Sequence, residues 1–326
     1  MRAALFFWVR AHTDRPRQNS KTAFLFAQQK TPRRWLSPHQ GRATRRRTME
    51  FRTGSTDFDS LEALPRTLLI PLSARAHGPR IFPSLNPEDQ YAEALLAAAG
   101  IEAKTTAADA PVMLNVLWRT QLIKRLGQAF FERHPRSTGV NLGSGLAHYF
   151  QWLGNGHNSW VDTDLPEVIR LRQSLIPQTS KHCHNTALDL KKPGWWQHLK
   201  SHTSENGRPL LLVCEGVLMY LSASQVRALL REIGDNAPEG SELLVDFISP
   251  WGVQLQTHWA PDMPPFQWGA HNAMDIARMH PRLELMAQHS VAEAYGWGAS
   301  WAELCWRPWT GGTLYGLARL RVGEPG

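Results

Sequence analysis

The stretch Gly139-Val-Asn-Leu-Gly-Ser-Gly-Leu-Ala147, followed by Ser159-Trp-Val-Asp-Thr-Asp164, decides the fold. Each half reads as a short buried strand that ends in a turn. Two glycines, Gly143 and Gly145, follow the first strand, and the missing Cβ atoms let the backbone turn tightly and approach a ligand. The second strand ends in Asp164. A carboxylate about twenty residues beyond a glycine-rich turn is typical of α/β nucleotide sites, where it binds ribose hydroxyls.

The same stretch departs from the pattern of dinucleotide sites, Gly-x-Gly-x-x-Gly, because His148 stands at the position of the last glycine. A cradle for a pyrophosphate is therefore disfavoured, and a smaller adenosine ligand fits better. A Gly-x-Gly alone is equally compatible with an ordinary tight turn. The acidic strand end is what favours a nucleotide-like ligand.

Charge is distributed unevenly along the 326 residues, whose formal net charge is +8. Residues 1–48 hold 12 of the 36 Lys and Arg but only one of the 28 acidic residues, which leaves 24 basic and 27 acidic groups from Met49 onward. Because phosphate contacts need clustered cations, the rest of the chain is not expected to bind nucleic acid. We expect residues 1–48 to be a basic, disordered extension, with a targeting peptide or a start at Met49 as alternatives.

Membrane insertion and disulfide chemistry are both disfavoured by the sequence. No window approaches the roughly 20 apolar residues of a spanning helix. The three cysteines, Cys183, Cys214 and Cys305, are far apart and form no Cys-x-x-Cys pair, so neither a zinc site nor a disulfide framework is predicted. A soluble protein of the reducing cytoplasm is expected.

Alternating strand and helix patterns predict a parallel, doubly wound α/β sheet. Strands are expected at 139–142, 159–163, 210–214, 241–248 and 313–322, and helices at 115–134, 166–175 and 222–233. Asp164, Asp189 and Glu215 then fall at or just past strand ends, where such sheets bind ligands. Residues 49–114 and 249–312 fit the repeat poorly. We expect them to form a cap over the substrate within one domain spanning 49–326.

Three motifs in order resemble the leucine carboxyl methyltransferase family: Asn141-Leu-Gly-Ser-Gly-Leu, Asp164-Leu-Pro-Glu-Val-Ile-Arg-Leu-Arg172 and Cys214-Glu-Gly-Val-Leu-Met-Tyr-Leu221. Thr67-Leu-Leu-Ile-Pro-Leu-Ser-Ala-Arg-Ala76 resembles the opening of its bacterial small-molecule branch, which includes polyketide O-methyltransferases of the tetracenomycin type. The resemblance implies a class I methyltransferase with a Rossmann-like, mostly parallel seven-stranded sheet and a helical cap. It also implies S-adenosylmethionine as the cofactor, an antiparallel last strand and no metal.

The resemblance further implies roles in cofactor binding. Arg119 would pair with the methionine carboxylate, and Gly143 and Gly145 would admit the amino-acid portion. Asp164 would accept the ribose hydroxyls. The remaining cofactor residues would be Asp189 and Leu190, beside the adenine. A solvated helix arginine and a helix-capping aspartate are the alternatives for Arg119 and Asp189.

Two residues of the third motif are the catalytic candidates. Glu215 ends an apolar strand, where a carboxylate is costly unless a partner or a function retains it, and the resemblance places it at the cofactor's amino end near the methyl group. Tyr220 would line the acceptor pocket. A structural salt bridge and a packing tyrosine are the respective alternatives.

The chain departs from the family immediately after the second glycine. The usual Gly-x-Gly-Leu-Asp-Thr-Arg-Phe becomes Gly143-Ser-Gly-Leu-Ala-His-Tyr-Phe150, with the loss of an acid at Ala147 and a cation at Tyr149. A catalytically silent binding protein that keeps the methyltransferase fold is therefore an alternative to an enzyme.

Methyl transfer from a sulfonium requires alignment of the nucleophile and exclusion of water rather than a metal. A carboxylate acceptor is already ionised at neutral pH, whereas a phenol, with a pKa near 10, needs a base or a cationic neighbour. The sequence predicts an O-methyltransferase for a small polyketide-like carboxylate or hydroxyl compound, with methylation of a protein C-terminus as the alternative.

Seven of the fourteen tryptophans follow the predicted strand 241–248: Trp251, Trp259, Trp268, Trp297, Trp301, Trp306 and Trp309. Packing in the core is one interpretation of these tryptophans, and the lining of an aromatic acceptor pocket is the other.

Overall fold

One mixed sheet organises the computed structural model, which describes residues 66–98, 109–176, 180–203, 207–259 and 263–324. Within these residues seven strands pair in the order β3-β2-β1-β4-β5-β7-β6. Strands β1 to β5 run parallel, and β7 is antiparallel to both of its neighbours. The strands are β1 Thr138–Leu142, β2 Ser159–Asp164, β3 Cys183–Ala187, β4 Leu211–Cys214, β5 Glu242–Ile248, β6 Leu283–Ser290 and β7 Tyr315–Val322. The doubly wound α/β sheet with an antiparallel last strand is confirmed.

Two strands, β3 and β6, fall outside the strand ranges expected from the sequence. Strand β6 lies within 249–312, which was expected to belong to a cap, and forms the edge of the sheet beside β7. Its register shifts between Leu285 and Ala287, and most of its residues are at least partly exposed. A bulge and an exposed edge both break the alternation by which a strand is recognised.

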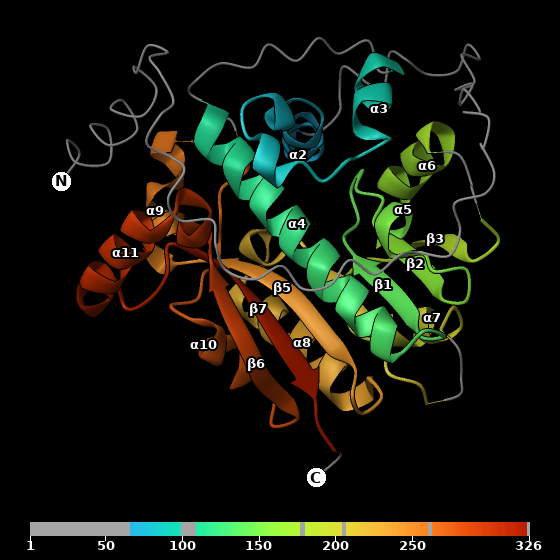
Figure 1. The fold of residues 1–326 in the computed structure, drawn as a ribbon. Helices are drawn as coiled ribbons and strands as arrows, with labels where there is room; N and C mark the ends of the chain where they lie inside the picture. Colours follow the sequence, from blue (N-terminus) through green and yellow to red (C-terminus); the bar gives the residue numbers. More distant parts are fainter. Residues whose placement is uncertain (1–65, 99–108, 177–179, 204–206, 260–262, 325–326) are drawn as a thin grey trace, which may run out of the picture. The chain divides into compact units, whose positions relative to one another are not determined.

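Helices cover the two faces of the sheet (Figure 1). On one face Leu211 and Val213 of β4 pack in a cluster with Ile123 of α4, Ala110–Arg133. On the other face Leu212 packs in a cluster with Leu229 of α8. The helices of this second face are α7 Trp195–Lys200, α8 Ala223–Asn236 and α10 Ala273–Ala277. Alternate strand residues thus enter opposite cores, as expected for a sheet buried on both sides.

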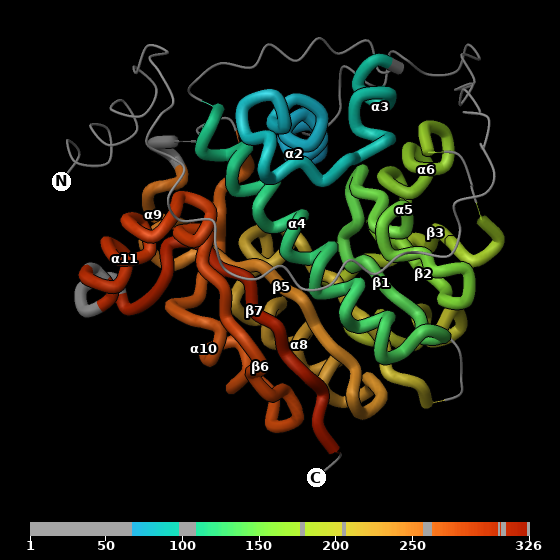
Figure 2. The backbone as a smooth tube through the Cα atoms, viewed as in Figure 1, coloured from blue at the N-terminus to red at the C-terminus, as the bar shows by residue number. Residues whose placement is uncertain are grey.

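The remaining helices lie near the ends of the strands or along the sheet edge (Figure 2). Apolar side chains of α2, α3 and the end of α6 form a third cluster that includes Leu72, Leu95 and Ile176. The full set of remaining helices among the described residues is α2 Arg66–His77, α3 Ala92–Ala98, α5 Phe150–Leu153, α6 Pro166–Leu175, α9 Pro250–Trp259 and α11 Trp297–Thr310. Short 3-10 turns are η2 Gly78–Arg80, η3 Pro83–Leu85, η5 Leu218–Tyr220 and η6 Val291–Tyr295.

The expectations about the N-terminal segment and about membrane-spanning helices depend on which residues the structure describes. Residues 1–48, expected to be a basic extension, and the domain start at Met49 lie outside the described residues. Among the described residues, no helix combines the length and the apolar character that crossing a membrane requires.

Candidate functional site

The predicted site residues converge at the carboxyl ends of β1, β2 and β4. These three strands are neighbours in the sheet, and the chain order reverses between β1 and β4. Ligands of open α/β sheets bind at such a reversal. The glycine turn follows β1, Asp164 ends β2 and Glu215 follows β4. The strand order therefore brings together residues that are far apart in the sequence.

The turn after β1 is fixed by hydrogen bonds to β2. Gly143 and Ser144 donate backbone N–H groups to the carbonyl oxygen of Thr163 at 2.9 and 2.8 Å. Gly143 has a φ of +73°, and a Cβ on it would lie 2.5 Å from Cγ2 of Val217. Both the left-handed backbone and the contact with the loop after β4 require glycine here.

We expect Gly143→Ala to destabilise the protein by roughly 2 to 3 kcal/mol, because it adds a steric clash to the usual cost of a side chain at positive φ. Gly156→Ala is the matched control, since Gly156 has a φ of +84° and nothing lies within 4 Å of its would-be Cβ. Urea denaturation of both variants measures the difference. Equal losses would show that the contact with Val217 contributes nothing.

Asp164 holds the same turn from the end of β2. Its Oδ2 accepts the N–H of Gly145 at 2.7 Å, and its Oδ1 accepts the N–H of Leu165 at 2.7 Å. Partial burial raises the pKa of the carboxyl, against the lowering effect of these two N–H groups. A carboxylate can accept about four hydrogen bonds. Asp164 therefore retains acceptor capacity for a ligand after it has fixed the turn.

Arg119 and Glu215 form a buried ion pair across the site. Arg119, on α4, donates from Nε to Oε1 of Glu215 at 2.6 Å. Its Nη1 donates to the hydroxyl of Tyr315 at 2.6 Å and to Oδ2 of Asp246 at 3.1 Å. Among the described residues no hydrogen bond involves Nη2 of Arg119. Nη2 is therefore the donor left for a ligand carboxylate.

Two tyrosines complete the surroundings of this pair. The hydroxyl of Tyr149 donates to Oε2 of Glu215, and that of Tyr315 donates to Asp246. Asp246 also accepts the N–H of Gly216 at 2.8 Å. Tyr149, Asp246 and Tyr315 were not among the predicted site residues. Asp246 carried a usable signal, because it is an acid within the otherwise apolar run 243–248 of strand β5.

Burial and charge oppose each other in the pKa values of this network. Burial alone would raise the pKa of Glu215, but Arg119, Arg75 and the Tyr149 hydroxyl outweigh it and the pKa is lowered. For Asp246 burial prevails over Arg119, and the pKa is raised. Burial would lower the pKa of Arg119, yet Tyr315, Glu215 and Asp246 raise it well above the usual value. Glu215 and Arg119 are therefore both charged at neutral pH.

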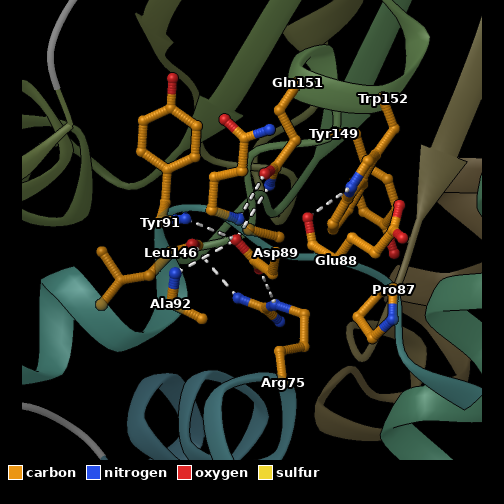
Figure 3. Close-up of polar contacts among 12 residues, drawn as sticks. Arg75, Pro87, Glu88, Asp89, Tyr91, Ala92, Leu146, Tyr149, Gln151 and Trp152 are labelled. Atoms are coloured by element: carbon orange, nitrogen blue, oxygen red, sulfur yellow. Dashed lines mark hydrogen bonds and ion pairs between the residues drawn. The ribbon is translucent and has the colours of Figure 1, made fainter. Parts of the chain in front are cut away.

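A second buried ion pair fastens α2 and the segment before α3 to the turn after β1 (Figure 3). Arg75 on α2 donates from Nε to Oδ2 of Asp89 at 2.8 Å and from Nη2 to the carbonyl oxygen of Leu146 at 3.3 Å. Asp89 Oδ1 accepts the N–H of Tyr91 and the side-chain amide of Gln151, each at 3.0 Å. The hydrogen bonds of Arg75 and Asp89 thus connect α2 and the segment before α3 to the glycine turn and to Gln151.

Asp162 forms a third ion pair, beneath the turn. It is fully buried and pairs through Oδ2 with Nη2 of Arg172 at 2.6 Å, while Nη1 of Arg172 donates to the carbonyl oxygens of Gly145 and Ala147 at 2.8 and 2.6 Å. His148 and Cys183 also offer ligand atoms that lie within 4.8 Å of one another and of the Asp162 carboxylate. Because Arg172 already neutralises Asp162, we interpret this group as structural.

For three further predicted residues, Asp189, Leu190 and Tyr220, the structure shows no hydrogen bond or ion pair to Arg119 or Glu215 among the described residues. Asp189 follows β3 and accepts the N–H of Lys191 at 3.0 Å, which closes a local turn rather than capping a helix, and Leu190 packs against the core. Tyr220 is half-buried and stacks edge to face on Phe266, with ring centroids 5.3 Å apart. Burial raises the pKa of Tyr220 to about 12.

The tryptophans after β5 differ in their surroundings. Trp268 is buried, whereas Trp251, Trp297 and Trp301 are 43%, 87% and 65% exposed. Core packing therefore accounts for Trp268 but not for these three. The side chains of Trp259, Trp306 and Trp309 lie outside the described part of the structure.

Sequence comparisons relate this arrangement to methyltransferases. The model of the leucine carboxyl methyltransferase family matches residues 74–234. The tetracenomycin polyketide synthesis O-methyltransferase TcmP of Streptomyces glaucescens is 26% identical over 238 residues, which cover 72% of this chain and 85% of TcmP. The S-adenosyl-L-methionine-dependent methyltransferase dpfgK of Gibberella zeae is 28% identical over 190 residues, or 53% of this chain and 61% of dpfgK.

Solved structures share the fold at low sequence identity. A Thermobifida fusca protein assigned as a methyltransferase superposes with a TM-score of 0.53 and 14% identity, over 78% of this chain and 94% of that protein. A DUF574 family protein from Streptomyces avermitilis gives a TM-score of 0.51 and 14% identity, over 77% of this chain and 99% of its own. These similarities confirm the class I methyltransferase fold.

Proposed function

We propose that this protein, whose residues 74–234 belong to the leucine carboxyl methyltransferase family, is an O-methyltransferase. With S-adenosylmethionine as the methyl donor, it transfers a methyl group to an oxygen atom of a small molecule. The acceptor is a carboxylate or a hydroxyl compound of polyketide-like character. The name of the related TcmP, an O-methyltransferase of polyketide synthesis, supports both the oxygen acceptor and its class.

One observation carries the proposal: at the chain reversal of the sheet, Asp164 at the end of β2 and Glu215 after β4, paired with Arg119 of α4, flank the glycine turn that follows β1. Nη2 of Arg119 can donate to the methionine carboxylate, and Glu215 can accept from the ammonium group. Asp164 can accept from the ribose hydroxyls, and Asp189 with Leu190 lies at the next strand end for the adenine. Gly143 and Gly145 keep the turn free of side chains where the cofactor approaches.

The cofactor, when bound, supplies the activated methyl group, so the protein has to align the acceptor and exclude water. Tyr220 and Phe266 offer an aromatic wall beside the network of Arg119 and Asp246, both of which influence the pKa of Tyr220. A flat acceptor would stack there. Tyr220 itself is a poor base at neutral pH, because it stays protonated up to about pH 12.

The pH dependence of turnover should identify the acceptor chemistry. For a carboxylate acceptor we expect turnover to be flat from about pH 6 to 9, since the nucleophile is ionised throughout that window. For a phenol, turnover should rise with pH as the hydroxyl loses its proton. Steady-state rates with methyl-labelled cofactor and extracted acceptors measure the profile.

The position of the label discriminates the remaining alternatives. Base-labile label on a small molecule indicates a methyl ester, and base-stable label indicates an ether. Label on protein C-termini would contradict the small-molecule acceptor. Absence of any label together with absence of cofactor binding would favour a silent binding protein.

A further inference from the structure

The side chain of Tyr149 stands where the family pattern has an arginine, and it contacts the residue proposed to bind the cofactor's ammonium group. We infer that Tyr149 is a positioning residue: it holds the Glu215 carboxylate by a hydrogen bond and, because it is neutral, it favours the positively charged methyl donor over the demethylated product. This inference rests on the proposed function and identifies the residue that sets the relative affinity of the cofactor site for the methyl donor and for the demethylated product.

The geometry around Tyr149 leaves it little freedom. Its side chain is 1% exposed, and its ring packs against Trp152 and Trp160 with centroids 5.6 and 6.4 Å away. The hydroxyl reaches Oε2 of Glu215, while Oε1 of the same carboxylate is held by Arg119. Both carboxylate oxygens are therefore oriented by buried donors. A ligand ammonium group meets an acceptor that is already in place.

Charge distinguishes this arrangement from one with an arginine at the same position. Among the described residues Arg119 is the only ion-pair partner of Glu215. Arg75 also influences the pKa of Glu215, but it is itself paired with Asp89 at 2.8 Å. A second guanidinium at position 149 would neutralise Glu215 further. The methyl donor and its product share the ammonium and carboxylate groups and differ by the charge on sulfur, so an added cation penalises the donor more than the product.

Two substitutions in the full-length protein separate the hydrogen bond from the charge. Tyr149→Phe removes the hydroxyl and adds no charge, so both S-adenosylmethionine and S-adenosylhomocysteine should bind about tenfold more weakly with an unchanged ratio. Tyr149→Arg should lower the ratio of donor to product affinity by about tenfold. Isothermal titration calorimetry with each ligand gives the four dissociation constants, and thermal melting shows that each variant is folded.

Tyr295→Phe is the matched control. Tyr295 is a partly buried tyrosine packed against the same core cluster, and burial raises its pKa. We expect its affinities and their ratio to match the wild type. A general loss of structure would weaken both ligands without changing the ratio, so the ratio in Tyr149→Arg reports charge specifically.

The outcomes distinguish this inference from the proposed function. If the unaltered protein binds neither ligand, the proposed function fails and the inference with it. If the unaltered protein binds and Tyr149→Phe binds equally well, Tyr149 does not position Glu215 although the function stands. An unchanged ratio in Tyr149→Arg overturns the charge argument.

Discussion

Replacing Asp164 by alanine is expected to weaken the binding of S-adenosylmethionine by roughly 2 to 3 kcal/mol, the scale of hydrogen bonds to charged groups. Two effects act in the same direction. The ribose hydroxyls lose their charged acceptor. The backbone N–H groups of Gly145 and Leu165, each 2.7 Å from a carboxylate oxygen of Asp164, lose the hydrogen bonds that fix the glycine turn. Calorimetric titration of the cofactor measures the loss.

Asp164→Asn separates these two contributions. The amide keeps the shape of the side chain and one acceptor oxygen for the turn, but it has no charge and only one oxygen. We expect its melting temperature to stay closer to wild type than that of Asp164→Ala, while much of the loss in affinity remains. Wild-type affinity in both variants would remove Asp164 from the site.

The parts of the fold that were predicted from the sequence depend on local patterns. Strand β1 with its glycine turn and β2 with its terminal acid each lie within a few consecutive residues, and the amphipathic pattern of α4 is repeated along one continuous helix. The resemblance of three motifs to one family is confirmed by the match over residues 74–234. Strand β6 was missed because its bulge and its exposed edge remove the periodicity on which such predictions depend.

The contacts of the site could not be predicted in the same way. Arg119 and Glu215 are 96 positions apart, and Arg119 and Tyr315 are 196 apart, so only the assembled sheet brings them together. The sequence showed that position 149 lacks the family's cation. It could not show that the tyrosine hydroxyl reaches Glu215, because that contact depends on the path of the turn after β1. Arg119 and Glu215, both predicted from the sequence to bind the cofactor, form one ion pair, and their role in cofactor binding stays a prediction.

Replacing Arg119 by leucine should have the largest effect on stability, a loss of about 3 to 5 kcal/mol in the free energy of unfolding at neutral pH. The substitution leaves Glu215 and Asp246 buried without the guanidinium that contacts both carboxylates. Urea denaturation of the full-length protein measures the loss. Arg80→Leu is the control, because the side chains of Arg80 and its partner Glu93 are 70% and 63% exposed, and such surface pairs contribute little.

The pH dependence of that loss tests its physical cause. In the wild type the pKa of Glu215 is lowered, so the stability contributed by this carboxylate is present above its unfolded pKa and is lost as the pH falls through the folded pKa. Without Arg119 the desolvation of Glu215 prevails and raises its pKa, so the variant relieves the buried charge by taking up a proton. The stability difference between wild type and Arg119→Leu should therefore be largest near pH 7 and should narrow towards about pH 4, the range in which carboxyl groups ordinarily titrate. A deficit that is equal at both pH values would mean that lost packing of the arginine side chain, and not uncompensated charge, accounts for the destabilisation.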